Sequence, residues 1–345
     1  MIIDLQHRSW LLIFIFLSIF LYLAAVIWGS VYISPSEILN ILLGKSTDIS
    51  NTGIIFKVRI PEATTAAFAG AGLSVAGLLM QTLFRNPLAG PSILGISSGA
   101  SLGVAFFLLY MGGSIQNLSK GFLTLNRGVP LVFFATAGAI GISLVLLAFS
   151  SIVKDNVVLL IIGILISNLT LSLVSIWQSF SNPEAIQDYL MWTFGSLGSC
   201  RELSLFILCA IIIFGLFLSF LIFKPLNSLL LGEDYSASLG VNIAFLRIGI
   251  LFITALLTGS ITAFCGPIAF VGMISPHIVK TLFSSSDHKL VIPGSIFCGA
   301  AILLLCDIAS RLPGSYMVLP INSVTALFSA PILIFVLLKK KRFRI

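Results

Sequence analysis

The residues of this chain that could carry chemistry are few and scattered. The 345 residues include 12 Asp and Glu, 19 Lys and Arg, and 3 His, and they form no HExxH motif, no GxSxG motif and no set with metal-ligand spacing. The tripeptide Gly44-Lys45-Ser46 is similar to the end of a P-loop. A P-loop requires a glycine five positions before its second glycine, and Leu39 stands there. We therefore expect no catalytic site, no metal site and no nucleotide cofactor in this chain, and predict that it is not an enzyme.

Asp307 is the acidic residue that lies deepest in an apolar segment. It stands four residues before Arg311, so the two side chains can meet on one helix face. Ion-coupled transporters keep ionisable residues at membrane depth to carry the coupling ion. Two interpretations follow: an ion pair near the membrane surface, which we favour, and a proton relay.

The five cysteines give no sign of a redox or metal motif. They form no CxxC pair and mostly lie in apolar segments: Cys200, Cys209, Cys265, Cys298 and Cys306. A buried thiol behaves as a small hydrophobic group. We favour this interpretation over metal ligation or a disulfide.

Composition indicates an integral membrane protein. Hydrophobic residues make up 58% of the chain and charged residues 9%, whereas about a quarter of the residues of a soluble domain are charged. Apolar runs long enough to cross a bilayer recur at about 10–30, 64–82, 92–111, 129–150, 157–179, 203–223, 243–264, 267–283, 291–309 and 321–338. We expect an all-α protein with about ten transmembrane helices, the first of them retained rather than cleaved as a signal. The boundaries are least clear in 180–202 and 259–283.

The charges predict the topology. An even number of spans puts both termini on one side, and the tail Lys339-Lys-Lys-Arg-Phe-Arg344 favours the cytoplasmic side. Arg85 and Arg247 would then lie on the cytoplasmic side as well. The net charge of +7 is explained by topology, because no basic soluble face with interleaved aromatic residues is available for a nucleic acid. No polar connection is long enough to bury its own core, so residues 1–345 are expected to form a single transmembrane domain.

Two spans carry polar stripes. In the fifth span the spacing i, i+4, i+7 and i+11 puts polar residues on one helix face, and the tenth span repeats the pattern; the residues are Asn168, Ser172, Ser175 and Ser179, then Asn322, Thr325 and Ser329. Hydrogen bonds between helices are one interpretation, and the wall of a water-filled translocation path is the other.

Small residues recur every four positions in the second and third spans. They are Ala66, Gly70 and Ser74, then Gly95, Gly99 and Gly103. This spacing lets helix backbones approach closely where lipid supplies no hydrophobic drive for association. We expect both spans to be buried in the bundle.

The longest connection on the predicted cytoplasmic side, 226–240, favours two short helices. Leucines cluster before Gly232, and Glu233 and Asp234 then open a second helix that ends at Gly240. Acidic residues at a helix start interact favourably with its dipole, so capping alone would explain them. A docking surface for a partner is the alternative.

Taken together, the ordered motifs resemble the FecCD/BtuC-type permeases, the membrane subunits of ABC importers for iron chelates, heme and cobalamin. The resemblance covers nearly the entire chain. It rests on Arg59-Ile-Pro-Glu62, Phe84-Arg-Asn-Pro-Leu-Ala-Gly-Pro91, Leu94-Gly-Ile-Ser-Ser-Gly-Ala100, the connection 226–240, Gly266-Pro-Ile-Ala-Phe-Val-Gly272, Ser275-Pro-His-Ile278, Asp287-His-Lys289, Asp307 with Arg311, Leu319-Pro-Ile321 and Thr325 through Pro331.

The resemblance implies partners and site residues. Such permeases have the type II ABC importer architecture, in which two ten-helix subunits enclose a path near their fifth and tenth helices. Two ATPase subunits, which bind ATP and Mg, would dock on the cytoplasmic coupling segment, here Leu230, Gly232, Glu233, Asp234, Leu239 and Gly240. A substrate-binding protein would cap the outer face through Arg59 and Arg311. Glu62 departs from the family pattern, which often has a second arginine there, and Lys57 is a candidate substitute.

We therefore expect the transmembrane subunit of an ATP-driven importer in a bacterial cytoplasmic membrane. Its cargo would be a bulky metal chelate, with iron–siderophore or heme ahead of cobalamin. The alternative is an ion-coupled secondary transporter, which would have a midplane ion site. An integral-membrane enzyme would need a catalytic constellation, and the sequence contains none.

Overall fold

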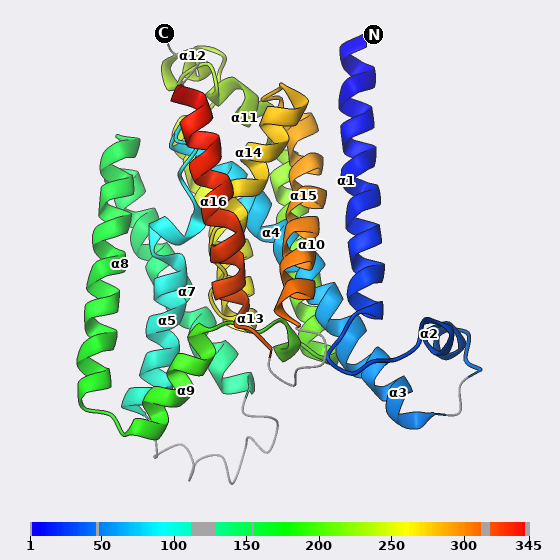
Figure 1. Ribbon diagram of the computed structural model, residues 1–345. Coiled ribbons are helices and arrows are strands. Elements are labelled where there is room, and N and C mark those ends of the chain that lie inside the picture. Colours follow the sequence, from blue (N-terminus) through cyan, green and yellow to red (C-terminus); the bar gives the residue numbers. More distant parts are fainter. Residues whose placement is uncertain (1, 46–47, 112–127, 154, 312–317, 342–345) are drawn as a thin grey trace.

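The computed structural model describes residues 2–45, 48–111, 128–153, 155–311 and 318–341. Each of the ten predicted spans corresponds to a helical segment (Figure 1). In chain order these segments are α1 (Ile2–Ile27), α4 (Ile60–Leu83), α5 (Ile96–Ala105) with η2 (Pro91–Leu94) and η3 (Phe106–Tyr110), α7 (Gly128–Ile152), α8 (Asn156–Ser179), α10 (Glu202–Leu221), α13 (Ile243–Cys265), α14 (Val271–Phe283), α15 (His288–Ser310) and α16 (Ile321–Lys341).

Within the described ranges, seven helices are long and apolar enough to cross a membrane, and shorter apolar helices join them. The predicted all-α membrane architecture is therefore confirmed. α14 has 13 residues, which gives a length of about 20 Å against about 30 Å of hydrocarbon. Gly266 and Phe270, in the connection before α14, have φ angles of +75° and +65°. This irregular backbone explains why the sequence does not show clearly where one helix ends and the next begins within 259–283.

Short helices lie at the two ends of the bundle. α2 (Pro35–Leu42), α3 (Ile49–Ile54) and α9 (Pro183–Thr193) lie at one end (Figure 1). α11 (Phe223–Leu229) and α12 (Glu233–Ser238) lie at the other end, together with the start of α1 and the last turns of α16. Both chain ends are thus on the side of α11 and α12, as an even number of crossings requires.

α4 is the central helix of the subunit. It packs against α10, α13, α14 and α15, and every residue from Ala69 to Leu83 is buried. A Cβ atom built on Gly70 would lie 2.3 Å from the carbonyl oxygen of Gly299 on α15, and one on Gly103 would lie 1.9 Å from that of Phe134 on α7. The expected close backbone contacts of the second and third spans are therefore present.

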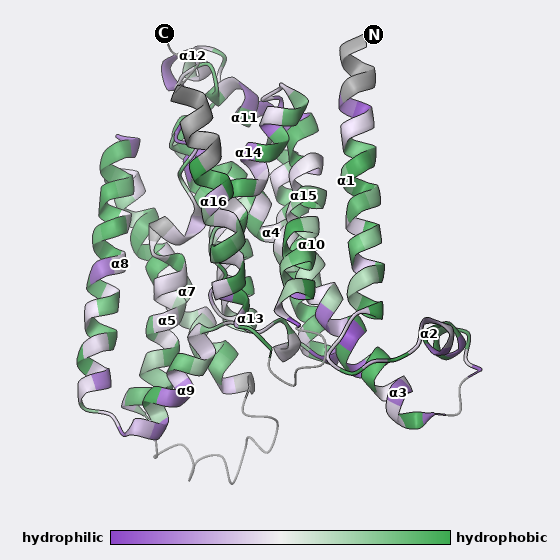
Figure 2. Cartoon of the chain, viewed as in Figure 1, coloured by the Kyte–Doolittle hydropathy of each residue, from purple (hydrophilic) through white to green (hydrophobic). Residues whose placement is uncertain are grey.

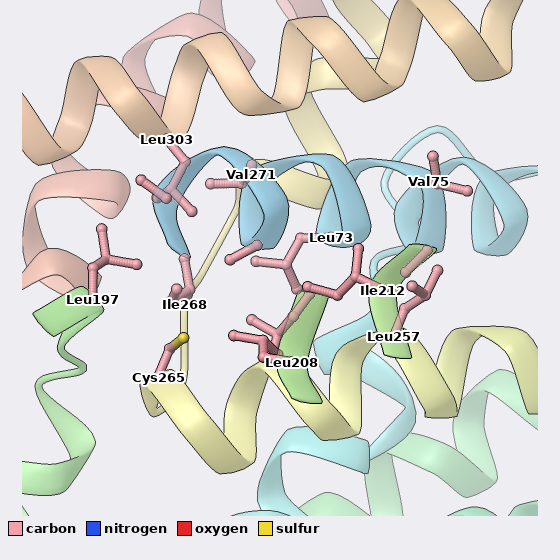
Figure 3. Packing of buried hydrophobic residues seen from close by; sticks show 14 of the residues in the cluster. Leu73, Val75, Leu197, Leu208, Ile212, Leu257, Cys265, Ile268, Val271 and Leu303 are labelled. Carbon is pink, nitrogen blue, oxygen red and sulfur yellow. The ribbon is translucent and has the colours of Figure 1, made fainter. Parts of the chain in front are cut away.

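Part of the core lies where α4, α10 and α13 meet. Figure 3 shows Leu73, Leu208, Ile212 and Leu257 packed together at this junction. Figure 2 shows the contrasting periphery, where α1 and α8 carry hydrophobic residues along most of their length, and many of these side chains are exposed on the subunit. Exposed apolar helices are expected where the solvent is lipid.

Candidate functional site

The predicted coupling segment folds as two short helices separated by a glycine. α11 ends at Leu229 and α12 begins at Glu233. Gly232, between them, has φ +127° and ψ 150°, a conformation that is essentially restricted to glycine. Glu233 and Asp234 occupy the first turn of α12, where their negative charges interact favourably with the helix dipole. Gly240, with φ +84°, follows the end of α12.

Several apolar side chains of this segment are exposed on the surface of the subunit. Leu226 and Leu229 are buried against the bundle. The exposed apolar set consists of Leu230, Leu231 (67% exposed), Tyr235 and Leu239 (58% exposed). Exposed apolar side chains on a segment beyond the membrane-spanning helices are typical of a protein interaction site. Asp234 and Gly240 are also exposed.

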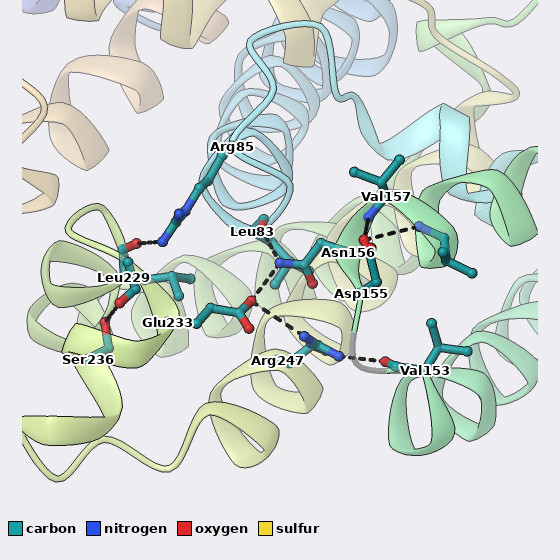
Figure 4. Close-up of polar contacts among 12 residues, drawn as sticks. Leu83, Arg85, Val153, Asp155, Asn156, Val157, Leu229, Glu233, Ser236 and Arg247 are labelled. Atoms are coloured by element: carbon teal, nitrogen blue, oxygen red, sulfur yellow. Dashed lines mark hydrogen bonds and ion pairs between the residues drawn. The ribbon is translucent and has the colours of Figure 1, made fainter.

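Glu233 points into the subunit and joins α12 to three other elements. Asn156 Nδ2, at the start of α8, donates to Glu233 Oε1 at 2.6 Å (Figure 4). Arg247 Nη2 of α13 forms an ion pair with the same oxygen at 3.4 Å. Arg247 Nη1 also donates to the carbonyl oxygen of Val153, just after α7, at 2.7 Å. One carboxylate therefore links α12 directly to α8 and α13, and Arg247 extends the link to the end of α7.

Asn227 forms the corresponding link from α11. Its Nδ2 donates to Asp287 Oδ1 at 2.6 Å, and its Oδ1 accepts from the backbone N and the Nδ1 of His288 at 2.8 and 2.7 Å. His288 Nε2 lies 2.8 Å from Thr82 Oγ1 of α4. Arg85 Nη2 donates to the carbonyl oxygen of Leu229 at 3.1 Å (Figure 4). α11 is thus attached to α15 and to the end of α4.

The segment therefore has two attachments. α11 is bonded to α15 and to Arg85 just after α4, and α12 is bonded to α8 and α13. The two attachments are connected, because α13 packs on α4 and Asn156 also donates to the carbonyl oxygen of Leu83 at the end of α4, at 3.1 Å. Gly232 is the junction between the two attachments.

The arginines predicted to dock a binding protein lie at the opposite end. Arg59 is 3% exposed, and its guanidinium donates to the carbonyl oxygens of Val26, Ile27 and Val31. These carbonyls are at or just beyond the end of α1, where the last four helical carbonyls have no intrahelical partner. Arg59 therefore caps α1 instead of lying on the surface of the subunit. Lys57, in contrast, is exposed.

Arg311 has the same inward orientation and is 4% exposed. It pairs with Asp307 on its own helix and with Glu62 Oε2 of α4 at 3.2 Å, and it donates to the carbonyl oxygen of Ala25 at 3.2 Å. The predicted ion pair of Asp307 and Arg311 is confirmed. Glu62 is a counter-ion for Arg311, a function that the sequence did not indicate. The docking function of the two arginines stays a prediction, since both are buried in the subunit.

A model of the FecCD transport family matches residues 14–339. This chain belongs to the FecCD transport family. It is 33% identical over 333 residues to the ABC transporter permease protein MJ0087 of Methanocaldococcus jannaschii, covering 95% of this chain and 93% of that protein. It is 31% identical over 337 residues to the vitamin B12 import system permease protein BtuC of Escherichia coli O9:H4, covering 98% of this chain and 97% of that protein.

A solved structure agrees with these relatives. An inward-facing conformation of a metal-chelate type ABC transporter superposes with a TM-score of 0.80 at 28% identity, covering 95% of this chain and 99% of that one. This FecCD family chain is accordingly a multi-pass permease of the ABC importer type, and it serves as a transport subunit.

The polar stripes of this FecCD family permease differ in exposure. The four stripe residues of α8 are exposed on the subunit, and the hydroxyls of Ser172 and Ser175 donate to carbonyls of their own helix. On α16, Thr325 and Ser329 are buried, and Asn322 Nδ2 donates to the carbonyl oxygen of Thr193 at the end of α9. In a single subunit only the α8 stripe faces outward, so the path function of both stripes remains a prediction.

Proposed function

We propose that this permease moves a bulky metal chelate, namely an iron–siderophore, heme or cobalamin, across a bacterial cytoplasmic membrane. It would act as a homodimer with two ATP-binding subunits and an external substrate-binding protein. The observation that carries the proposal is the coupling segment, in which the exposed apolar set lies on the same short helices as the side chains bonded to α8, α13, α15 and Arg85 at the end of α4. A partner ATPase would dock on Leu231, Tyr235 and Leu239.

The transmission of ATPase movement follows from the two attachments. ATP binding in the partner would displace α12, and Glu233 would carry that displacement to α8 and α13. α11 would stay with α4 and α15, because Asn227 and Arg85 hold it there. A shift of α8 and α13 relative to α4 and α15 would be the kind of two-state movement that switches a path between outward and inward opening.

The orientation follows from the same proposal. α11 and α12 would face the cytoplasm, because ATP is available there. Both termini would share that side, since they lie at the same end as these helices (Figure 1). The basic residues that end α16 agree with the positive-inside rule.

The choice of cargo would rest mainly with the binding protein. The α8 stripe offers one amide and three hydroxyls without charge, and such groups discriminate weakly among large solutes. The names of the relatives span vitamin B12 import and metal-chelate transport. We therefore propose the class of bulky chelates and assign specificity to another chain.

Co-purification tests the proposal. A C-terminal tag on the full chain, solubilisation in mild detergent and mass analysis should recover a P-loop ATPase at one copy per permease. A homogeneous permease without an ATPase would contradict the proposal if the purified chain also takes up solute into liposomes under an ion gradient. That pair of results would favour the secondary transporter.

A further inference from the structure

α1 packs on α15 and α4, and polar contacts also attach it to the bundle at its two ends. Near its start, His7 Nε2 lies 2.7 Å from the carbonyl oxygen of Phe283, and the rings of His7 and Phe14 each lie 6.1 Å from that of Phe283. At its far end, Arg59 and Arg311 bind its last carbonyls. These contacts fix the ends of α1.

Between the two attachments lies an open apolar groove of about 290 Å³, bounded by α1, α4, α10 and α15. Small side chains create the hollow, because Ser18, Ala67, Ala71 and Ala300 occupy positions where larger residues would fill it. Ile19 and Leu23 on α1, which line the groove, are more than half exposed on the subunit.

The groove offers no polar group to an occupant beyond two hydroxyls that are already bonded within the protein. Tyr22 Oη and Thr64 Oγ1 are 2.9 Å apart. Ser18 Oγ donates to the carbonyl oxygen of Ile15 at 2.8 Å. A water molecule needs two to four polar partners to be held in a cavity, so water is a poor occupant. An apolar chain needs none.

The surroundings of the groove are hydrocarbon. All four helices that bound it are long and apolar enough to cross the membrane, and the lining residues Ser18, Ala71, Leu216 and Ile296 lie in their interiors, several residues from either helix end. At this depth the available solvent is the acyl chain of a lipid. A void would forfeit the dispersion contacts of every atom in its wall.

We propose that an acyl chain of a bilayer phospholipid occupies this groove and packs α1 against α4, α10 and α15. The site is distinct from ordinary lipid contact, because the chain would lie in a groove lined by residues of four helices and not on the face of one helix. Lipid tails are as apolar as leucine, so shape and packing hold the chain there, without any gain from leaving water. The proposal concerns the permease in its membrane and does not depend on its cargo.

Photolabelling tests this site. The full permease, with the partners that co-purify with it, is reconstituted in vesicles of phosphatidylethanolamine and phosphatidylglycerol that contain a trace of phosphatidylethanolamine with a diazirine in its acyl chain. After irradiation, labelled peptides are quantified by mass spectrometry. Peptides containing Ala67–Ala71 and Ile296–Leu304 should be labelled at least about threefold more than the α10 stretch Phe206–Phe214, which has exposed side chains. The reason is that the groove contacts the acyl chain on several sides, whereas the α10 stretch contacts it on one.

Filling the groove provides the variant test. The double change Ala71→Leu with Ala300→Leu should bring labelling of the groove peptides down to the level of Phe206–Phe214. Ala210→Leu, at an exposed position on α10, makes one such substitution outside the groove and should change nothing. Elution as a single species in detergent checks that each variant is folded.

Two results would overturn the proposal. The first is equal labelling of the groove peptides and the α10 stretch in the unmodified protein. This result would contradict the proposed lipid site even if the filled variant does not fold. The second is groove labelling that persists in a folded filled variant, since the label would then come from lipid passing over the surface.

Discussion

At the scale of single residues, the buried charges act within the subunit. Arg59, Glu62, Asp307 and Arg311 gather where α1, α4 and α15 meet. A buried charge is costly unless it is paired and hydrogen-bonded, and here each arginine also binds helix-end carbonyls. Glu62 completes the set, because it supplies Arg311 with a second carboxylate.

Removing Glu62 should therefore destabilise the subunit. Glu62→Gln takes one anion from the buried Arg311, and the loss of a hydrogen bond to a charged group costs about 1.5–3 kcal/mol. Thermal unfolding of the purified permease in detergent measures the effect as a lower Tm. Glu184→Gln, at an exposed position on α9, is the matched control and should leave Tm unchanged; equal Tm values for both variants would contradict the importance of the Glu62 pair.

A further prediction distinguishes two functions of these arginines, namely stabilising the subunit and docking the binding protein. Arg59→Gln and Arg311→Gln should each lower Tm in the absence of any binding protein, because the carbonyls of α1 lose their donors. In the Arg311 variant, Glu62 and Asp307 also lose their counter-ion. An arginine that served only in docking would leave Tm of the isolated permease unaltered. Reduced capture of the loaded binding protein with normal Tm would restore the docking interpretation.

At the scale of elements, the conformation of Gly232 lets α11 and α12 attach to different helices. Gly232→Ala introduces a side chain that would contact only Arg85, at 3.5 Å, so steric overlap is minor. The φ of +127° remains, and holding a non-glycine residue there costs about 1–3 kcal/mol. We expect lower ATP-driven uptake with normal assembly. Gly249→Ala, within α13 and with open space around its Cβ, is the control and should have no such effect.

The sequence predicts elements better than it predicts contacts. The ten spans follow from apolar runs whose length matches the bilayer, and the small residues of α4 indicate close packing because backbone approach needs them. Asn156 and Asn227 are single polar residues at helix ends with no periodic pattern, so their contacts with Glu233 and His288 depend on tertiary structure. Arg59 and Arg311 carry a recognisable motif, but only the structure reveals that their side chains turn inward toward α1.

At the scale of the whole molecule, the subunit has a dense centre and an open periphery. α4 is buried by its neighbours, while α8 exposes its polar stripe and α1 borders an apolar groove. We propose that a second copy covers the α8 stripe and that lipid fills the groove. The coupling segment lies at the end of this assembly, where it reaches the helices on both sides of α4.

The most direct test of the account is the number of solute molecules moved per ATP hydrolysed. The permease, its ATPase and its binding protein are reconstituted in proteoliposomes, and uptake and hydrolysis are measured together. Glu233→Gln, which removes the ion pair with Arg247, should lower this ratio, while Gly249→Ala, the control within α13, should keep it. An unchanged ratio in the Glu233 variant, or uptake that needs no ATP, would contradict the proposal that α12 drives transport through Glu233.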